Sequence, residues 1–109
     1  MSSEEKLQEL QGLEQQSQSL TQQRQQFQQQ LLEIENAQRE VGKTTESYRI
    51  LGNVMVAANK EELLKELGEK VEHLQVRVSA LQKQEEILRD QSKKLQEEVM
   101  QELKDNEQH

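Results

Sequence analysis

The stretch SYRILGNVMVAA, from Ser47 to Ala58, decides the fold because its hydrophobic pattern differs from that of the segments around it. Its apolar residues recur with a period of about two, and β-branched side chains replace the Gln and Glu found on either side. Gly52 and Asn53 stand at its centre, and both residue types tolerate the positive φ of tight hairpin turns. The stretch therefore predicts a β-hairpin in which Leu51 lies opposite Val54.

Both faces of this predicted hairpin are mostly apolar. The register continues outward in three further pairs: Ile50 with Met55, Arg49 with Val56, and Tyr48 with Ala57. An isolated two-stranded hairpin is marginally stable in water, and its two edges are open to pairing. We therefore predict that the hairpin is covered by other chains, with oligomer contacts made by Tyr48, Ile50, Leu51, Val54, Met55 and Val56.

Upstream of the hairpin, apolar residues recur at every seventh position, as they do in a coiled-coil helix: Leu13, Leu20, Phe27, Ile34 and Val41. The companion position is partly polar: Leu10, Ser17, Arg24, Leu31 and Gln38. The run QQRQQFQQQ could be a disordered low-complexity tract, but the heptad continues through it and Gln is a good helix former. We expect residues 1–42 to form a coiled-coil helix, ended by Gly42 in a left-handed conformation.

A second heptad pattern runs downstream of the hairpin. One position holds Leu67, Leu74, Leu81, Leu88 and Leu95, and the other holds Leu64, Val71, Val78, Glu85, Ser92 and Val99. Asn59, with Glu62 three residues later, predicts an N-terminal cap and a helix that begins near Lys60. Residues 60–109 are thus predicted as a second coiled-coil helix and residues 43–59 as the oligomerisation linker. Polar seam residues such as Glu85 and Ser92 fix register or loosen packing.

The two predicted helices can fold back on each other as an antiparallel pair. Equal displacement from the hairpin brings four seam pairs together: Ile34 with Leu67, Phe27 with Leu74, Leu20 with Leu81, and Leu13 with Leu88. The predicted fold class is mainly α, a long antiparallel two-helix coiled coil joined by one β-hairpin.

The composition argues against several other classes of protein. The 109 residues are 31% hydrophobic and 2% aromatic, which is little material for a globular core or a catalytic pocket. A net charge of −7 disfavours nucleic acid and anionic membranes as partners. Without cysteine, a nucleophile triad or a ligand cluster, we expect no enzyme, metal or cofactor, and His73 should be a surface residue. The absence of an export signal or a spanning segment predicts a cytosolic protein.

The segment from Tyr48 to Val99 resembles the hairpin and second helix of archaeal-type prefoldin β subunits. The α-type subunits of that family carry two hairpins, and this chain has room for only one. The resemblance implies a hexamer of two α-type and four β-type subunits whose hairpins join into a β-barrel platform. It also implies an ATP-independent chaperone that holds unfolded client proteins at its coiled-coil tips and delivers them to a group II chaperonin.

The same resemblance implies a client-binding tip made of Leu7, Leu10, Leu13, Leu95, Val99, Met100 and Leu103. The alternative for these residues is a fraying coiled-coil end with no binding role. The acidic stretch from Glu97 to His109 is either a solvated tail or a contact for the chaperonin. A structural coiled-coil scaffold or assembly protein is the alternative function, although a scaffold would not need the apolar hairpin.

Overall fold

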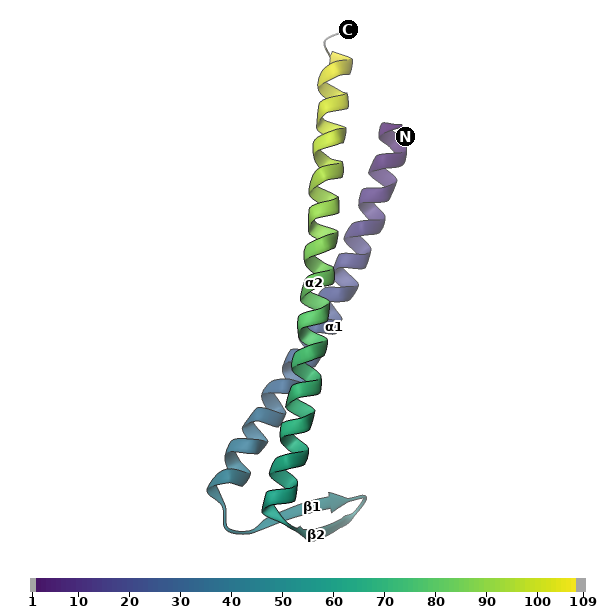
Figure 1. The fold of residues 1–109 in the computed structure, drawn as a ribbon. Coiled ribbons are helices and arrows are strands. Elements are labelled where there is room, and N and C mark those ends of the chain that lie inside the picture. The colour runs from purple at the N-terminus through teal and green to yellow at the C-terminus, as the bar shows by residue number, and fades with distance from the viewer. Residues whose placement is uncertain (1, 108–109) are drawn as a thin grey trace. The chain divides into compact units, whose positions relative to one another are not determined.

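The computed structural model describes residues 2–107, and the ends of both predicted terminal helices, residues 1, 108 and 109, lie outside the described residues. The elements follow the order α1 (Ser3–Lys43), β1 (Ser47–Leu51), β2 (Val54–Ala58) and α2 (Lys60–Glu107) (Figure 1). The mainly α fold with two long helices and one hairpin is confirmed. No helix among the described residues is long and apolar enough to cross a membrane.

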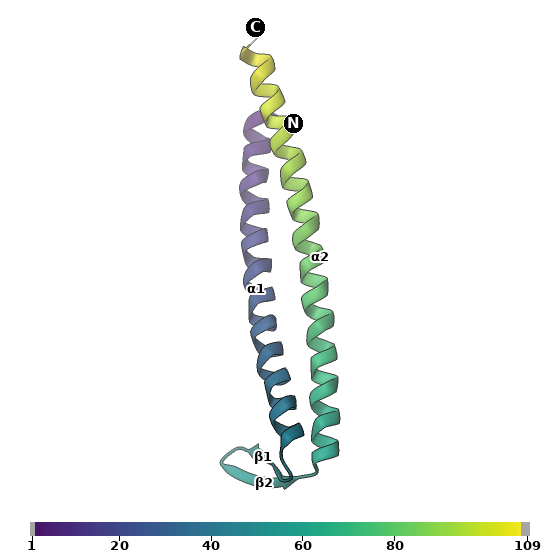
Figure 2. The same ribbon diagram turned by 90° about the vertical axis from the view of Figure 1, so that its left-hand side faces the viewer.

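The chain divides into two compact units, and segments of both helices belong to each. The terminal unit comprises residues 1–24 and 79–109, and the hairpin unit comprises residues 25–78. Within each unit, the α1 and α2 segments run in opposite directions (Figure 2). Within each unit, the apolar residues on the facing sides of the two helices form a small hydrophobic core.

The hairpin has the register that the sequence predicts. All four predicted pairs are present, from Leu51 opposite Val54 to Tyr48 opposite Ala57. Gly52 has a φ of 61°, whereas no other residue type among the described residues has a positive φ. Positive φ at only the first of the two loop positions is the pattern of a type II′ turn, which matches the right-handed twist of the strands.

The start of α2 is capped as predicted, but the end of α1 is not. The Oδ1 atom of Asn59 accepts a hydrogen bond of 3.1 Å from the backbone N–H of Glu62. The expectation of a left-handed Gly42 is wrong, because α1 continues to Lys43 and Gly42 has no positive φ. Instead, the Lys60 ammonium donates to the backbone carbonyl of Gly42 at 3.1 Å and to that of Thr44 at 2.7 Å. A cation at exposed helix-end carbonyls stabilises the terminus without a glycine turn.

The Gln-rich run of α1 is helical, as the heptad predicts. In the hairpin unit, Phe27 lies half-buried, and the Arg77 guanidinium lies 5.1 Å from the centroid of its ring. A cation over an aromatic face is attracted by the ring quadrupole. This contact between the two helices therefore stabilises the half-buried ring in addition to the free energy gained from its burial.

The predicted pairing of the two helices is wrong by about one helical turn. Equal displacement would place Thr21 opposite residue 80, but its hydroxyl donates to the Glu85 carboxylate at 3.2 Å. Ser3 likewise reaches Glu102 at 2.5 Å rather than residue 98. In sequence, the midpoint of each of these pairs falls at the hairpin turn, near residues 52 and 53. The midpoint of the expected pairs falls two residues earlier.

The buried part of each seam is small. Leu74 and Val78 in the hairpin unit, and Leu95 and Val99 in the terminal unit, are 6–9% exposed, and no described side chain is fully buried. Glu85 is also buried, and its Oε1 atom accepts from Arg24 Nε at 2.5 Å. A carboxylate removed from water requires partners of this kind. Arg24, Thr21 and Glu85, named here the seam cluster, therefore form a satisfied polar layer in a thin apolar core.

We predict that the R24L variant of the chain unfolds at a lower temperature than the wild type. It removes the ion-pair partner of a buried carboxylate, and an unsatisfied buried acceptor costs about 1–3 kcal/mol. Thermal unfolding followed by circular dichroism measures the change. The R24L/E85L double variant should recover most of the loss, and a double variant no more stable than R24L would contradict this account of the seam cluster.

Candidate functional site

The hairpin presents an exposed apolar surface. All six predicted oligomerisation residues are exposed in the single chain, by 42% to 69%: Tyr48, Ile50, Leu51, Val54, Met55 and Val56. They lie on both faces of a two-stranded sheet whose outer edges have no further strand among the described residues. Complete burial of one large apolar side chain is worth about 1.5–3 kcal/mol. This surface, named here the hairpin surface, can therefore supply substantial binding free energy to a partner.

One ion pair joins the hairpin to α2, and a second contact joins α2 to the end of α1. Arg49 on β1 donates to Glu66 on α2 at 2.6 Å. Lys60 bridges the carbonyls at the end of α1, as described above. The Ser47 hydroxyl at the start of β1 is buried and has no hydrogen-bond partner among the described residues. The hairpin is thus attached at one end and leaves its apolar faces open to a partner.

The seven predicted client-binding residues fall into two groups in the terminal unit. Leu95 and Val99 are buried, and Leu10 and Leu13 are half-buried. Leu7, Met100 and Leu103 are 50–59% exposed. The last three are named here the tip leucines and methionine. They are the members of the predicted set that a partner could reach without separating the helices.

Polar contacts join the start of α1 to the end of α2. Lys6 forms ion pairs with Glu98, at 3.7 Å, and with Glu102, which also accepts a hydrogen bond from Ser3. The hydrogen bond to Glu102 raises the pKa of Lys6 above its ordinary value. The hydrogen bonds from Lys6 and Ser3 hold the pKa of Glu102 below its ordinary value. These four residues, named here the terminal clamp, fasten the helices where apolar side chains face solvent.

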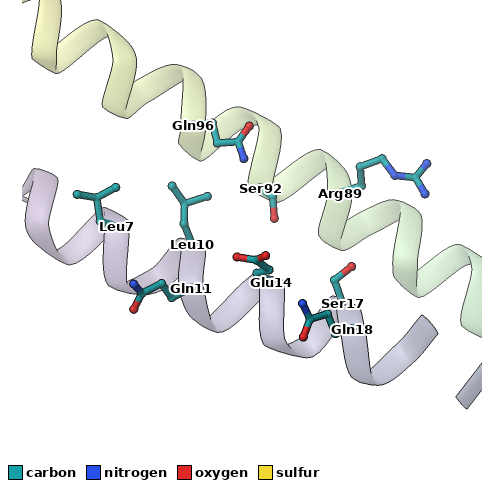
Figure 3. Close-up of a pocket in the computed structure, with 9 residues that line it drawn as sticks. All are labelled: Leu7, Leu10, Gln11, Glu14, Ser17, Gln18, Arg89, Ser92 and Gln96. Carbon is teal, nitrogen blue, oxygen red and sulfur yellow. The ribbon is translucent and has the colours of Figure 1, made fainter. Parts of the chain in front are cut away.

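A hollow lies between the helices of the terminal unit (Figure 3). Its volume is about 600 Å³, and nine residues from both helices line it. Leu10 and Ser17 point from α1 toward α2, and Ser92 and Gln96 point from α2 toward α1. Its lining combines apolar surface with uncharged hydrogen-bonding groups and one residue of each charge, Glu14 and Arg89. It can therefore contact both apolar and polar parts of a ligand.

The described residues include no cluster of metal-ligating side chains. No group of three or more His, Cys, Asp or Glu side chains among residues 2–107 could hold a metal ion. His73 is exposed on the outer surface of α2, as the sequence predicts, near Glu69 and Glu72. The surfaces described above are suited to binding.

Sequence analysis missed three features of the terminal unit. It placed Glu85 and Ser92 at polar seam positions but did not identify the seam cluster, the terminal clamp or the hollow. Each depends on which residues of α1 and α2 lie side by side, and the expected alignment was one turn out. Centring the helix pair on the Gly52 turn would have placed Lys6 near Glu98 and Thr21 near Glu85.

Comparison with known proteins gives one consistent family. The family model described as prefoldin subunit matches residues 4–106. Prefoldin subunit beta of Archaeoglobus fulgidus is 38% identical over 85 residues, which are 75% of this chain and 73% of that protein. The corresponding subunit of Thermococcus onnurineus is 38% identical over 92 residues, 82% and 79% of the two chains.

Solved structures give the same result. The crystal structure of the prefoldin beta subunit from Thermococcus strain KS-1 is 32% identical, with a TM-score of 0.88 over 93% of this chain and 91% of that chain. The prefoldin beta2 subunit of the same strain, at 18% identity and a TM-score of 0.69, covers 79% and 95% of the two chains and shows similarity of fold alone.

We predict that the terminal clamp opens in acid. The lowered pKa of Glu102 means that its contribution to stability is present above the unfolded-state pKa and is lost as the pH falls through the folded-state pKa. The raised pKa of Lys6 means that its contribution is lost only as the pH rises through the folded-state value. The clamp should therefore be fully formed between about pH 5 and about pH 10.

The measurement is backbone ¹⁵N relaxation of residues 3–10. Motion in this segment should increase below about pH 4 in the wild type. The E102Q variant should show the increased motion already at neutral pH and little further change in acid. Equal rigidity of wild type and E102Q at neutral pH would show that the clamp does not hold the start of α1.

We also predict that the I50D/V54D variant loses assembly with partner subunits while its helix content stays nearly unchanged. Carboxylates buried without partners in an apolar interface are costly, whereas the seams lie on other residues. Light scattering gives the mass and circular dichroism the helix content. The V76D/I87D variant, which adds the same charge at helix positions 69% and 56% exposed, is the matched control and should assemble normally. Assembly by I50D/V54D at wild-type mass would contradict the role of the hairpin surface.

Proposed function

Because the chain belongs to the prefoldin subunit family and is similar to its β subunits, we propose that it serves in an ATP-independent holdase. In this proposal it captures unfolded polypeptides at its coiled-coil tips and delivers them to a group II chaperonin. The family consists of non-enzymatic chaperone subunits. The match over residues 4–106 carries the proposal, since it covers both the hairpin surface and the terminal unit.

The hairpin surface is proposed as the contact with other prefoldin subunits. Its six residues are exposed on both faces of the sheet, so coverage of one face by another hairpin would still leave the second face for a further neighbour. Open strand edges allow neighbouring hairpins to pair by backbone hydrogen bonds. We propose that these contacts build a β-barrel platform in a cytosolic hexamer of two α-type and four β-type subunits.

The tip leucines and methionine are proposed as the client contact. Unfolded chains expose apolar side chains that folded proteins bury, and flexible Leu and Met side chains adapt to many shapes. The terminal clamp supports this role because it joins the helices through ion pairs and leaves these apolar groups uncovered. Capture of this kind is driven by binding free energy alone and needs no ATP.

The proposal is tested by mixing the chain with a two-hairpin α-type partner and measuring suppression of aggregation of an unfolded protein. Protection without any nucleotide, followed by transfer of the held protein to a group II chaperonin, is the expected result. A requirement for ATP, or no protection by an assembled complex, would contradict it. Assembly without protection would instead favour a structural scaffold.

We predict that the L7S/M100S/L103S variant assembles normally but protects clients poorly. Removal of three exposed apolar contacts should raise the chaperone concentration needed for half protection at least tenfold. That change corresponds to about 1.4 kcal/mol, less than the value of burying one leucine.

The matched control is the L32S/V76S/I87S variant, which removes three apolar side chains of similar exposure from other helix surfaces. It should protect clients as well as the wild type does. Equal loss in both variants would show that general surface hydrophobicity, and not the tip, holds the client.

A further inference from the structure

The apolar seams of the terminal unit do not by themselves fix how α1 and α2 align. In the observed alignment Leu20 and Leu88 line one surface hollow, and a second hollow is lined by Leu13 and Leu95. Equal displacement from the hairpin, about one helical turn away, would bring Leu20 to Leu81. It would also bring Leu13 to Leu88. Each of these α1 leucines meets an α2 leucine in both alignments, so apolar burial distinguishes them poorly.

The terminal clamp also fits both alignments. Lys6 pairs with Glu98 and with Glu102, which lie about one helical turn apart on α2. A slide to equal displacement would bring Glu98 into the place that Glu102 now holds. The side chains of these two carboxylates are 44% and 33% exposed, and ion pairs at such exposure contribute little to stability. The clamp can therefore fasten the helices in either alignment.

The seam cluster, in contrast, fits the observed alignment and not the other. Glu85 is buried, and its carboxylate accepts from Arg24 Nε at 2.5 Å and from the Thr21 hydroxyl at 3.2 Å. Equal displacement would place Glu85 opposite Gln16 and would place Arg24 opposite Arg77. The two guanidinium groups would then repel each other, and the carboxylate would lose its cation. This cluster therefore discriminates between the two alignments.

A slide of one full heptad is disfavoured in the same way. Both seams repeat every seven residues, so such a slide restores the apolar pattern. In one direction it would place Glu85 beside Glu14 and Ser17. In the other direction it would place this carboxylate beside Gln28 and Leu31. Neither place supplies a cation, so the seam cluster opposes both slides.

We propose that the seam cluster sets the alignment of α1 and α2 in the terminal unit. A single buried polar contact can specify the register of a coiled coil at a cost in stability. This role goes beyond that of a satisfied polar layer, because an apolar pair at the same positions would stabilise the helices and leave several alignments open. The proposal does not depend on the holdase function.

The alignment determines which side chains the end of the terminal unit covers. Ser3 at the start of α1 reaches Glu102, so Val99 lies within the paired part of α2 and is 6% exposed. At equal displacement, Ser3 would lie opposite Glu98 and Val99 would lie beyond the start of α1. The seam cluster, about four helical turns from Val99 along α2, therefore controls how much apolar surface the tip exposes.

The alignment can be measured in the full-length chain as the distance between two nitroxide spin labels, by pulsed electron paramagnetic resonance. The chain has no cysteine, so the exposed positions of E5C and K83C place one label on each helix of the terminal unit. Labelled chain is diluted with unlabelled chain, so that only distances within one chain contribute. A slide to equal displacement moves the labels about 6 Å closer along the helix axis, and a heptad slide moves them by about 10 Å.

The first test replaces the seam cluster by apolar residues. The R24L/E85L variant should show the wild-type distance together with at least one further population displaced by about 6 Å or about 10 Å. The S17L/S92L variant also adds two leucines to the seams but keeps the cluster, so it is the matched control and should show the wild-type distance alone. A single wild-type distance in R24L/E85L, or the same further populations in the control, would overturn the proposal.

The second test reverses charges. The R24E variant places a negative charge beside Glu85 in the observed alignment and opposite Arg77 at equal displacement, so it should shift to the shorter distance. The R24E/E85R variant restores opposite charges within the cluster and should return to the wild-type distance.

Circular dichroism confirms that each variant keeps its helix content. The wild-type distance in R24E, or a shortened distance in R24E/E85R, would overturn the proposal. The leucine and charge-reversal series are independent, so either one decides if a variant of the other does not fold.

Discussion

The exposed apolar hairpin is the feature on which the rest of the structure depends. A chain whose described side chains are never fully buried cannot cover six large apolar residues by itself. The hairpin contacts α2 through the ion pair of Arg49 with Glu66, and its six large apolar residues stay exposed. The hairpin therefore presents an apolar surface that only another chain can cover.

In the terminal unit, polar and apolar side chains have different roles. Polar side chains join the helices at the terminal clamp and at the seam cluster, whereas a soluble coiled coil would ordinarily use apolar layers. Apolar side chains that do not have to hold the helices together, such as Leu7 and Leu103, can then face solvent. Between the two polar clusters, small seam residues leave the hollow. The exposed apolar side chains and the hollow of this unit therefore both follow from an incomplete seam.

The sequence predicted the elements better than their alignment. The hairpin register and the Asn59 cap follow from local chemistry, because a turn or a cap is specified by residues that are close together in the chain. The end of α1 did not follow, because it depends on Lys60, which reaches it from the other helix. The seam cluster was missed for the same reason. Heptads define which face of a helix is buried, but several alignments of two such faces preserve the pattern.

Amide hydrogen exchange of residues 47–58 tests most directly the claim that other subunits cover the hairpin. The measurement compares the chain alone with the chain assembled with a two-hairpin α-type partner. Strand amides that face outward from the open edges should exchange rapidly in the free chain and become strongly protected on assembly. Amides near the tip, such as those of residues 100–105, should change little. Unchanged exchange in the hairpin, with new protection only along the helices, would contradict the account.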